Sequence, residues 1–219
     1  MRRAQLEHII RASGAITDDS EIIVIGSQAI LATDPEPAPE LVQSIEADVC
    51  PLNRPELSDL IDGSIGELSR FHETFGYYGH GLSPEAAVLP KSWRSRLVRL
   101  QNENTNNVIG YCLSPIDLAY SKLAAGRPKD LEFAGALLKY QYVTKEQILQ
   151  VAAEGPTRLP EGQNECGLAE LLAERILIAE RNAKRAGTVS SGDEFLERVR
   201  STREDNPDQP PSRNRGVKL

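Results

Sequence analysis

The 219-residue chain is poor in cysteine and aromatic residues and has no long apolar run. Its three cysteines, Cys50, Cys112 and Cys166, are an odd number without a CxxC spacing. This argues against a disulfide framework or a zinc site and is typical of a reducing compartment. No segment approaches the roughly 18 apolar residues of a membrane span, and the basic start "MRRAQLEHIIRASG" lacks the apolar core of a signal peptide. We therefore expect a cytoplasmic protein that does not enter the membrane.

The chain also lacks an excess of positive charge. Its net charge is −7 and its pI is about 5.1, so there is no global electrostatic case for nucleic-acid binding, although local basic patches stay open. Neither GxGxxG nor GxxxxGK[ST] occurs, so neither a dinucleotide fold nor a P-loop is supported. With 40% hydrophobic and 26% charged residues, the composition is that of a globular protein with a real core.

The apolar patterning divides the chain near residue 113. Before that point we expect strands at 21–26 and 44–50, helices at 3–13 and 55–68, and β-like segments from 75 to 113 that include "EAAVLP". After it, the pattern is helical: two helices between 114 and 140, then 144–153, 165–186 and 193–203. We predict an α/β (α+β) core with a mixed sheet of about four or five strands. The expected domains are the core (1–113), a helical region (114–200) and a disordered tail (201–219).

The stretch "SIEADVCP" (44–51) carries two carboxylates at alternate positions. In a strand, Glu46 and Asp48 share one face, whereas Ala47 and Val49 line the other. Acidic residues are rare in strands and like charges on one face repel. A solvated sheet face explains the pair, and so does a divalent metal such as Mg²⁺, which takes hard oxygen ligands.

Gly26 and Ser27 join the first apolar strand to an expected helix start. A glycine permits a sharp turn, and a helix N-terminus presents unpaired N–H groups to an anion such as a phosphate. An ordinary turn with Ser27 as the N-cap explains the same residues.

The segment "SPIDLAYSKLAAGRPKD" (114–130) contains two expected helix starts. Ser114 as N-cap and Asp117 at the third helical position form a capping box, so Asp117 is interpreted as structural. Lys122 lies off the polar stripe of its helix, so it either extends its ammonium group to the surface or points into a site. Asp130 lies at the second helix start, where its charge interacts favourably with the helix dipole. The neighbouring cations, Arg127 and Lys129, are explained as solvated surface residues.

The segment "KSWRSRLVR" (91–99) is the local basic patch of this acidic chain. A strand that alternates basic residues around an aromatic ring suits nucleic acid, and a solvated strand face is the alternative. The residues are Lys91, Arg94, Arg96 and Arg99 around Trp93.

Taken together, these segments resemble the core motif of the DNA polymerase beta-type nucleotidyltransferase superfamily: a strand ending in Gly-Ser, a helix, and a strand with two alternating acids. "CLSPIDLAYSKLAAGRPKD" resembles the AbiE-type and MenT-type toxin nucleotidyltransferases, which carry a helical lysine followed by Arg-x-Lys-Asp. "FHETFGYYGHG" and "VLPKSW" are similar to a bacterial branch of that group. The resemblance covers residues 20–140.

The resemblance implies Mg²⁺-dependent transfer of a nucleotide from an NTP to an acceptor hydroxyl. In the toxin branch the acceptor is often the tRNA 3′ end, and a partner antitoxin restrains the enzyme. The implied catalytic residues are Glu46, Asp48, Lys122 and Asp130, with the metal on Glu46 and Asp48, and with phosphates or acceptor bound by Gly26, Ser27, Arg127 and Lys129.

Three departures from the family pattern keep other functions open. Glu46 stands where the family usually has Asp, and the spacing from Gly-Ser to the acids is long. No third carboxylate is found, since Glu103 and Asp117 are poor candidates, and no partner pattern gives His72 or His80 a role. The alternatives are a non-catalytic nucleotidyltransferase-like binding protein and a small-molecule nucleotidyltransferase.

Overall fold

The computed structural model describes residues 1–160, 162 and 164–204, with side chains up to residue 185. The chain divides into two compact units, Met1–Ala183 and a second that begins at Lys184. The predicted tail (201–219) lies outside the described residues from 205 onward, and 201–204 close the last helix. All site residues discussed below belong to the first unit.

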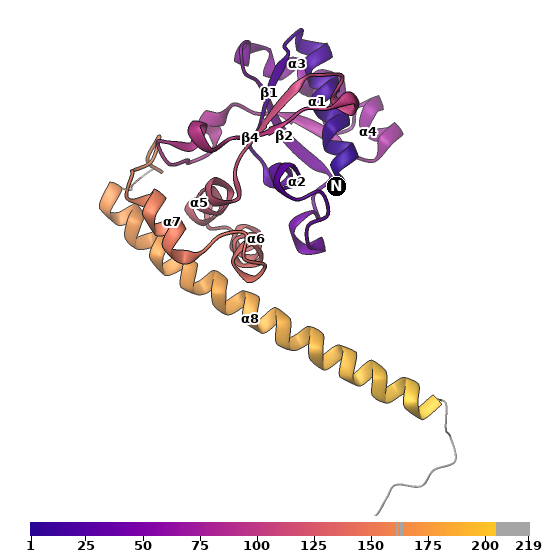
Figure 1. Cartoon of the computed structure of the whole chain (residues 1–219), viewed down its shortest axis with the longest axis vertical. Coiled ribbons are helices and arrows are strands. Elements are labelled where there is room, and N and C mark those ends of the chain that lie inside the picture. The colour runs from indigo at the N-terminus through magenta and orange to yellow at the C-terminus, as the bar shows by residue number, and fades with distance from the viewer. Residues whose placement is uncertain (161, 163, 205–219) are drawn as a thin grey trace, which may run out of the picture. The chain divides into compact units, whose positions relative to one another are not determined.

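A five-stranded mixed sheet forms the centre of the first unit (Figure 1). Its strand order is β3-β2-β1-β5-β4. The pairs β1–β5 and β2–β3 are parallel, whereas β1–β2 and β4–β5 are antiparallel. The sheet confirms the predicted α/β fold with a mixed sheet. The strands are β1 (Glu21–Val24), β2 (Glu46–Pro51), β3 (Tyr78–Gly81), β4 (Val98–Leu100) and β5 (Ile109–Cys112).

Helices surround the sheet and make up the C-terminal part, as the sequence predicts. Among the described residues, no helix has both the length and the apolar character that crossing a bilayer requires. The α-helices are α1 (Arg3–Thr17), α2 (Ile30–Thr33), α3 (Ser58–Ile65), α4 (Arg70–Phe75), α5 (Pro115–Ala125), α6 (Pro128–Lys139), α7 (Lys145–Ala152) and α8 (Glu165–Glu204), and the 3₁₀ turns used below are η1 (Ser27–Ala29), η4 (Pro84–Ala86) and η5 (Trp93–Arg96).

Two elements differ from the sequence-based expectation. The two helices expected at 165–186 and 193–203 are the single helix α8. The β-like segment "EAAVLP" instead enters the 3₁₀ turn η4, which Ser83 caps by accepting a hydrogen bond from the Glu85 N–H. Pro84 occupies the start of that turn, where the absence of an N–H has no cost.

Helices α1 and α3 pack on one face of the sheet (Figure 1). Their approach is close at Gly79 in β3, where a Cβ atom would lie 2.9 Å from Ile65 Cδ1 and 3.1 Å from Ile9 Cγ2. Ala47 and Val49 of β2 are fully buried. Because strand side chains alternate, the residues between them face away from α1 and α3.

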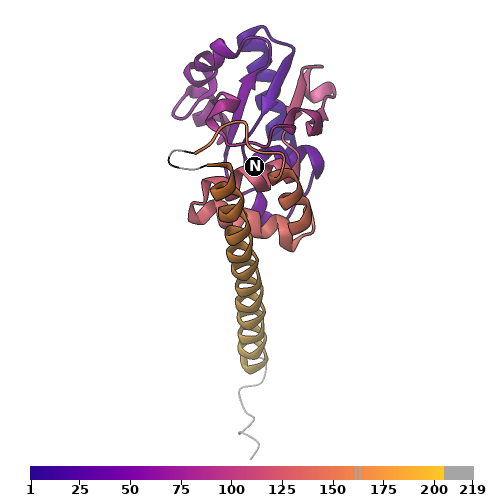
Figure 2. The ribbon, with the colours of Figure 1, turned by 90° about the vertical axis from the view of Figure 1, so that its left-hand side faces the viewer.

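Helices α5, α6 and α7 gather beside the first turns of α8 (Figures 1 and 2). The guanidinium of Arg175 in α8 donates hydrogen bonds to the carbonyls of Leu123 and Ala124 at 2.7 and 2.8 Å. The last carbonyls of a helix have no intrahelical partner, so Arg175 satisfies the end of α5. On the same helix, Leu172 and Ile176 are fully buried.

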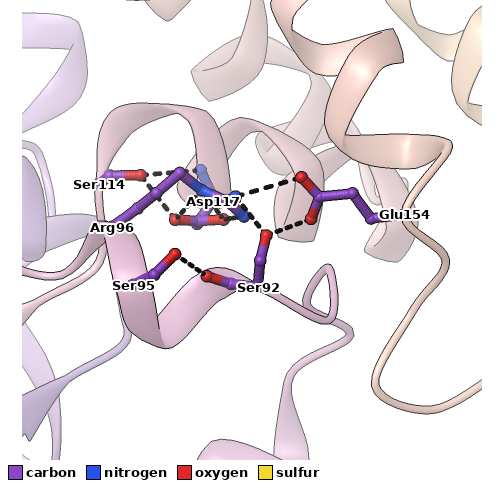
Figure 3. A network of polar contacts seen from close by, with 6 residues as sticks. All are labelled: Ser92, Ser95, Arg96, Ser114, Asp117 and Glu154. Carbon is purple, nitrogen blue, oxygen red and sulfur yellow. Dashed lines mark hydrogen bonds and ion pairs between the residues drawn. The ribbon is translucent and has the colours of Figure 1, made fainter.

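An ion-pair network around the buried Asp117 joins the helical part to the segment that precedes β4 (Figure 3). Arg96 donates from Nη2 and Nε to the Asp117 carboxylate at 2.6 and 3.2 Å, and from Nη1 to Glu154 at 3.5 Å. The Asp117 side chain has no exposed surface, and the Ser114 hydroxyl donates to it at 2.6 Å.

This network corrects two expectations. Residues 91–99 are not one strand, because Trp93–Arg96 form η5 and β4 begins only at Val98. Ser114 does cap α5 by accepting from the Asp117 N–H, but the Asp117 carboxylate is occupied by Arg96, a partner from a distant segment.

The network predicts that Arg96→Ala destabilises the protein far more than Arg94→Ala. Without Arg96, the Asp117 carboxylate stays buried without a cation, which typically costs about 3–5 kcal/mol. Arg94 is exposed and lies 4.6 Å from the Trp93 ring centroid, a contact worth about 0.5–1 kcal/mol at such sites. Urea denaturation of both variants measures the difference, and equal losses of unfolding free energy would contradict it.

Candidate active site

Glu46 and Asp48 lie on the same face of β2, opposite Ala47 and Val49. Their side chains keep 37% and 26% of their surface exposed, whereas Ala47 and Val49 have none. The alternation read from the sequence therefore places both carboxylates at the surface of the sheet that α1 and α3 do not cover.

His80 of β3 joins the two carboxylates, although no pattern in the sequence assigns it a role there. In the parallel pairing of β2 with β3, His80 lies opposite Asp48. Its Nδ1 is 3.0 Å from Glu46 Oε1 and 3.1 Å from Asp48 Oδ1. One ligand atom from each residue lies within 4.8 Å of the others, and no other His/Cys/Asp/Glu trio in the described part of the chain does so. Only the register of two strands, which are 32 residues apart at this point, brings the imidazole here.

The carboxylates change the proton affinity of this imidazole. Partial burial disfavours the charged ring, but the hydrogen bond and charge of Asp48, with the charges of Asp62 and Glu46, outweigh it and raise the pKa of His80 above its ordinary value. At the same edge, burial and the negative charges of Glu46 and Glu67 raise the pKa of Tyr78 to about 12. When it is protonated, His80 balances two like charges that would otherwise repel.

Gly26 contacts the Asp48 carboxylate directly. A Cβ atom at this position would lie 2.0 Å from Asp48 Oδ2, so every other residue would displace the carboxylate. The backbone of Gly26 is extended, so close approach is the reason for glycine here. The neighbouring Ile25 N–H donates to the Asp48 carbonyl at 3.1 Å, which fixes the two strands at this point.

Ser27 follows at a turn that differs from the expected helix start. The 3₁₀ turn η1 begins at Ser27 and leads into the four-residue helix α2, so no long helix points its N-terminus at the site. Gly26, and not Ser27, is the N-cap residue. The Ser27 hydroxyl is half-buried and accepts a hydrogen bond from Gln28 Nε2 at 3.4 Å.

Lys122 and Arg127 converge on Asp130. Lys122 Nζ lies 3.1 Å from Asp130 Oδ1, and Arg127 Nε lies 2.5 Å from Asp130 Oδ2. The Asp130 side chain is 1% exposed, whereas Arg127 remains 60% exposed. Burial works to raise the pKa of Asp130, but the hydrogen bond from Arg127 and the charge of Lys122 outweigh it and hold the pKa below its ordinary value.

The charge of Arg127 links this group to the acidic strand. The hydrogen bond and charge of Asp130 raise the pKa of Arg127, and the negative charge of Asp48 adds to them. Lys129 is exposed, and its side chain has no hydrogen bond or ion pair among the described residues. The structure thus relates Arg127 to the acidic strand and leaves Lys129 on the surface.

A protein-family comparison agrees with this arrangement. The family model described as "Nucleotidyltransferase of unknown function (DUF6036)" matches residues 4–143, which is more than half of the chain. The chain belongs to this family. The protein is therefore an enzyme of the nucleotidyltransferase class, for which an NTP is the substrate, and the matched region holds every site residue named above. No curated protein and no solved structure matches the chain significantly.

The contact between Gly26 and Asp48 predicts that Gly26→Ala impairs the nucleotidyltransferase without unfolding it. The new Cβ would displace the Asp48 carboxylate. By analogy with mutations of residues that orient metal ligands, we expect a loss of activity of roughly 10- to 100-fold. Nucleotidyl transfer and the thermal unfolding midpoint are the two measurements. Gly63→Ala in α3 is the matched control, because nothing lies within 4 Å of its Cβ position; it should retain activity. Full activity in Gly26→Ala would contradict the assignment.

The buried position of Asp130 predicts a pH-dependent loss of stability in Asp130→Asn. Removing charged hydrogen bonds typically costs about 1.5–3 kcal/mol. Because the folded-state pKa is lowered, the contribution is fully present above the unfolded pKa of about 3.9 and is lost as pH falls through the folded value. Urea denaturation across this range should show the wild type and the variant converging in acid.

The control for this prediction is Glu132→Gln, which changes an exposed acid of the same helix. It should leave the unfolding free energy within about 0.5 kcal/mol of wild type. A difference between wild type and Asp130→Asn that does not shrink in acid would contradict the charge-based explanation.

Proposed function

We propose that this nucleotidyltransferase transfers NMP from an NTP to an acceptor hydroxyl at the surface formed by Glu46 and Asp48, with Mg²⁺ as the metal. The observation that carries the proposal is the placement of two partly exposed carboxylates on one strand face, within 4.8 Å of a third ligand atom. Carboxylate oxygens suit Mg²⁺, which keeps several waters and also takes substrate phosphates. When bound, the cation neutralises charge on the triphosphate.

The cations of α5 and α6 bind phosphate in this proposal. Lys122 supplies a compact positive charge, and Arg127 is the more exposed of the two cations, with a charge that interacts favourably with that of Asp48. Ser27 offers a hydroxyl donor beside Gly26. Asp130 is enclosed by these two cations, so we assign it a positioning role in place of the catalytic one that the resemblance implied.

The transfer step itself needs one bond made and one broken. The acceptor oxygen forms a bond to the α-phosphorus, the bond from that phosphorus to the pyrophosphate oxygen breaks, and pyrophosphate leaves. Glu46 or Asp48 accepts the proton of the acceptor hydroxyl. No further reactant is required.

The acceptor and any partner rest on the resemblance to the toxin branch. That resemblance favours the tRNA 3′ end as acceptor and an antitoxin protein as partner. The basic segment 91–99 supports this only in part, since Arg96 is held by Asp117 and Glu154. Arg94 and Arg99 remain exposed and offer positive charge to RNA.

The test is transfer of label from each α-labelled NTP, with Mg²⁺, to total tRNA and, in parallel, to hydroxylated small molecules. We expect wild-type protein to label an acceptor and Asp48→Asn to lose more than the roughly 10- to 100-fold that mutation of an outer-shell partner costs. Asp59→Asn, an exposed acid at the start of α3, is the matched control and should keep wild-type activity.

Each outcome separates the competing functions. Label on tRNA supports the toxin-like acceptor, and label on a small molecule alone supports the small-molecule enzyme. NTP binding without transfer to either supports the non-catalytic protein and overturns the proposal. Equal activity of Asp48→Asn and wild type would exclude this site.

A further inference from the structure

We infer that His80 is the third ligand of this metal site, where a third carboxylate is missing, and that it shifts the metal preference from Mg²⁺ toward Mn²⁺. The inference deepens the proposed function and rests on it for the role of the metal. It concerns a residue that sequence patterns left without a role. Its ligand class is a divalent first-row transition-metal ion.

The spacing of the donor atoms fits neighbouring positions around one ion. His80 Nδ1 is 3.0 Å from Glu46 Oε1 and 3.1 Å from Asp48 Oδ1. In octahedral coordination with bonds of about 2.1 Å, adjacent ligand atoms are separated by about 3.0 Å. The imidazole therefore already lies at the distance from each carboxylate that ligands of a shared ion adopt.

The supporting structure holds all three side chains in place. Glu46 and Asp48 are two residues apart on β2, and β3 is hydrogen-bonded to β2 with His80 opposite Asp48. The Gly81 N–H, next to His80, donates to Asp62 Oδ1 of α3 at 3.0 Å. Gly26 contacts the other oxygen of Asp48, so Oδ1 is left toward His80. With 39% of its side-chain surface exposed, His80 is open to an ion from solvent.

The donor set favours a metal other than Mg²⁺. Two carboxylates alone suit Mg²⁺, which is a hard ion that keeps its waters. An imidazole nitrogen suits transition metals, and among these Mn²⁺ also accepts carboxylate oxygens readily. The ratio of Mn²⁺ affinity to Mg²⁺ affinity should therefore be higher for a site of two oxygens and one nitrogen than for a site with oxygens alone.

A second reading of the same contacts assigns His80 no metal. In that reading the ring only supplies a positive charge between the carboxylates. The two readings predict opposite effects of removing the ring: a lost ligand weakens Mn²⁺ binding, whereas a lost competing cation strengthens binding of both metals.

The experiment measures metal binding to the full chain without nucleotide. Titrations of MnCl₂ and MgCl₂ give dissociation constants, and pulsed EPR of bound Mn²⁺ detects a directly bound nitrogen. We expect nitrogen coupling in wild type and its loss in His80→Ala, with Mn²⁺ affinity reduced at least about tenfold. His80→Asp should restore an all-oxygen site, so it should bind Mg²⁺ and lose the preference for Mn²⁺.

His72→Ala is the matched control. His72 is also a partly exposed histidine, but its Nδ1 accepts the Leu68 N–H at 3.1 Å and is not within the metal-ligating group. This variant should keep the nitrogen coupling and the wild-type affinities. Circular dichroism of each variant verifies that loss of binding is not loss of folding.

The results separate this inference from the proposed function. Absence of nitrogen coupling in wild type, or tighter binding of both metals in His80→Ala, overturns the inference while Asp48-dependent transfer with Mg²⁺ stands. Nitrogen coupling without any transfer upholds the inference and overturns the proposed function. Failure of wild type to bind either metal without nucleotide overturns the inference, and the transfer assay with Mg²⁺ and NTP then decides the proposed function by itself.

Discussion

The structure depends on keeping two like charges side by side on a sheet face. Glu46 and Asp48 repel each other at the short spacing of alternate strand residues. Three features make the arrangement tolerable: the carboxylates stay partly exposed, His80 lies between them, and α1 and α3 pack on the opposite face. The lack of a side chain at Gly26 then leaves room for the Asp48 carboxylate. His80 compensates these charges when it is protonated, and a bound cation would compensate them as well.

In the helical part, two buried carboxylates are likewise compensated by nearby positive charges. "SPID" and "RPKD" are both helix starts with proline at the first helical position and aspartate at the third. In each, the aspartate is almost fully buried and its charge is met by an arginine: Arg96 for Asp117 and Arg127 for Asp130. Burying an ion is costly unless its partner is well placed. The Arg96–Asp117 pair therefore connects η5 to α5. Arg127 and Asp130 belong to one helix start, and Asp130 is connected to α5 through Lys122.

Local patterns were sufficient wherever a segment's structure depends on its own residues. The apolar run at 21–26 and the alternation at 44–50 predicted β1 and β2, and the proline-containing helix starts predicted α5 and α6. The predictions were wrong where the structure of a segment depends on residues outside that segment. "EAAVLP" has β-like composition, but its first two residues belong to the turn that Pro84 starts, and at its end Pro90 forms an isolated β-bridge with Pro156. The sequence of segment 91–99 predicts one strand. In the structure, Arg96 belongs to the turn η5 and forms an ion pair with the buried Asp117.

The same distinction between local patterns and long-range contacts applies to the candidate site. By itself, the sequence determined that Glu46 and Asp48 share a face, because strand periodicity follows from covalent geometry. It also determined which cations begin the helices after residue 113. Only the tertiary structure decided that His80 meets both carboxylates, that Gly26 contacts Asp48, and that Asp130 is enclosed by Lys122 and Arg127. These contacts depend on strand register and helix packing, which are set by the burial of the whole core and not by any one segment.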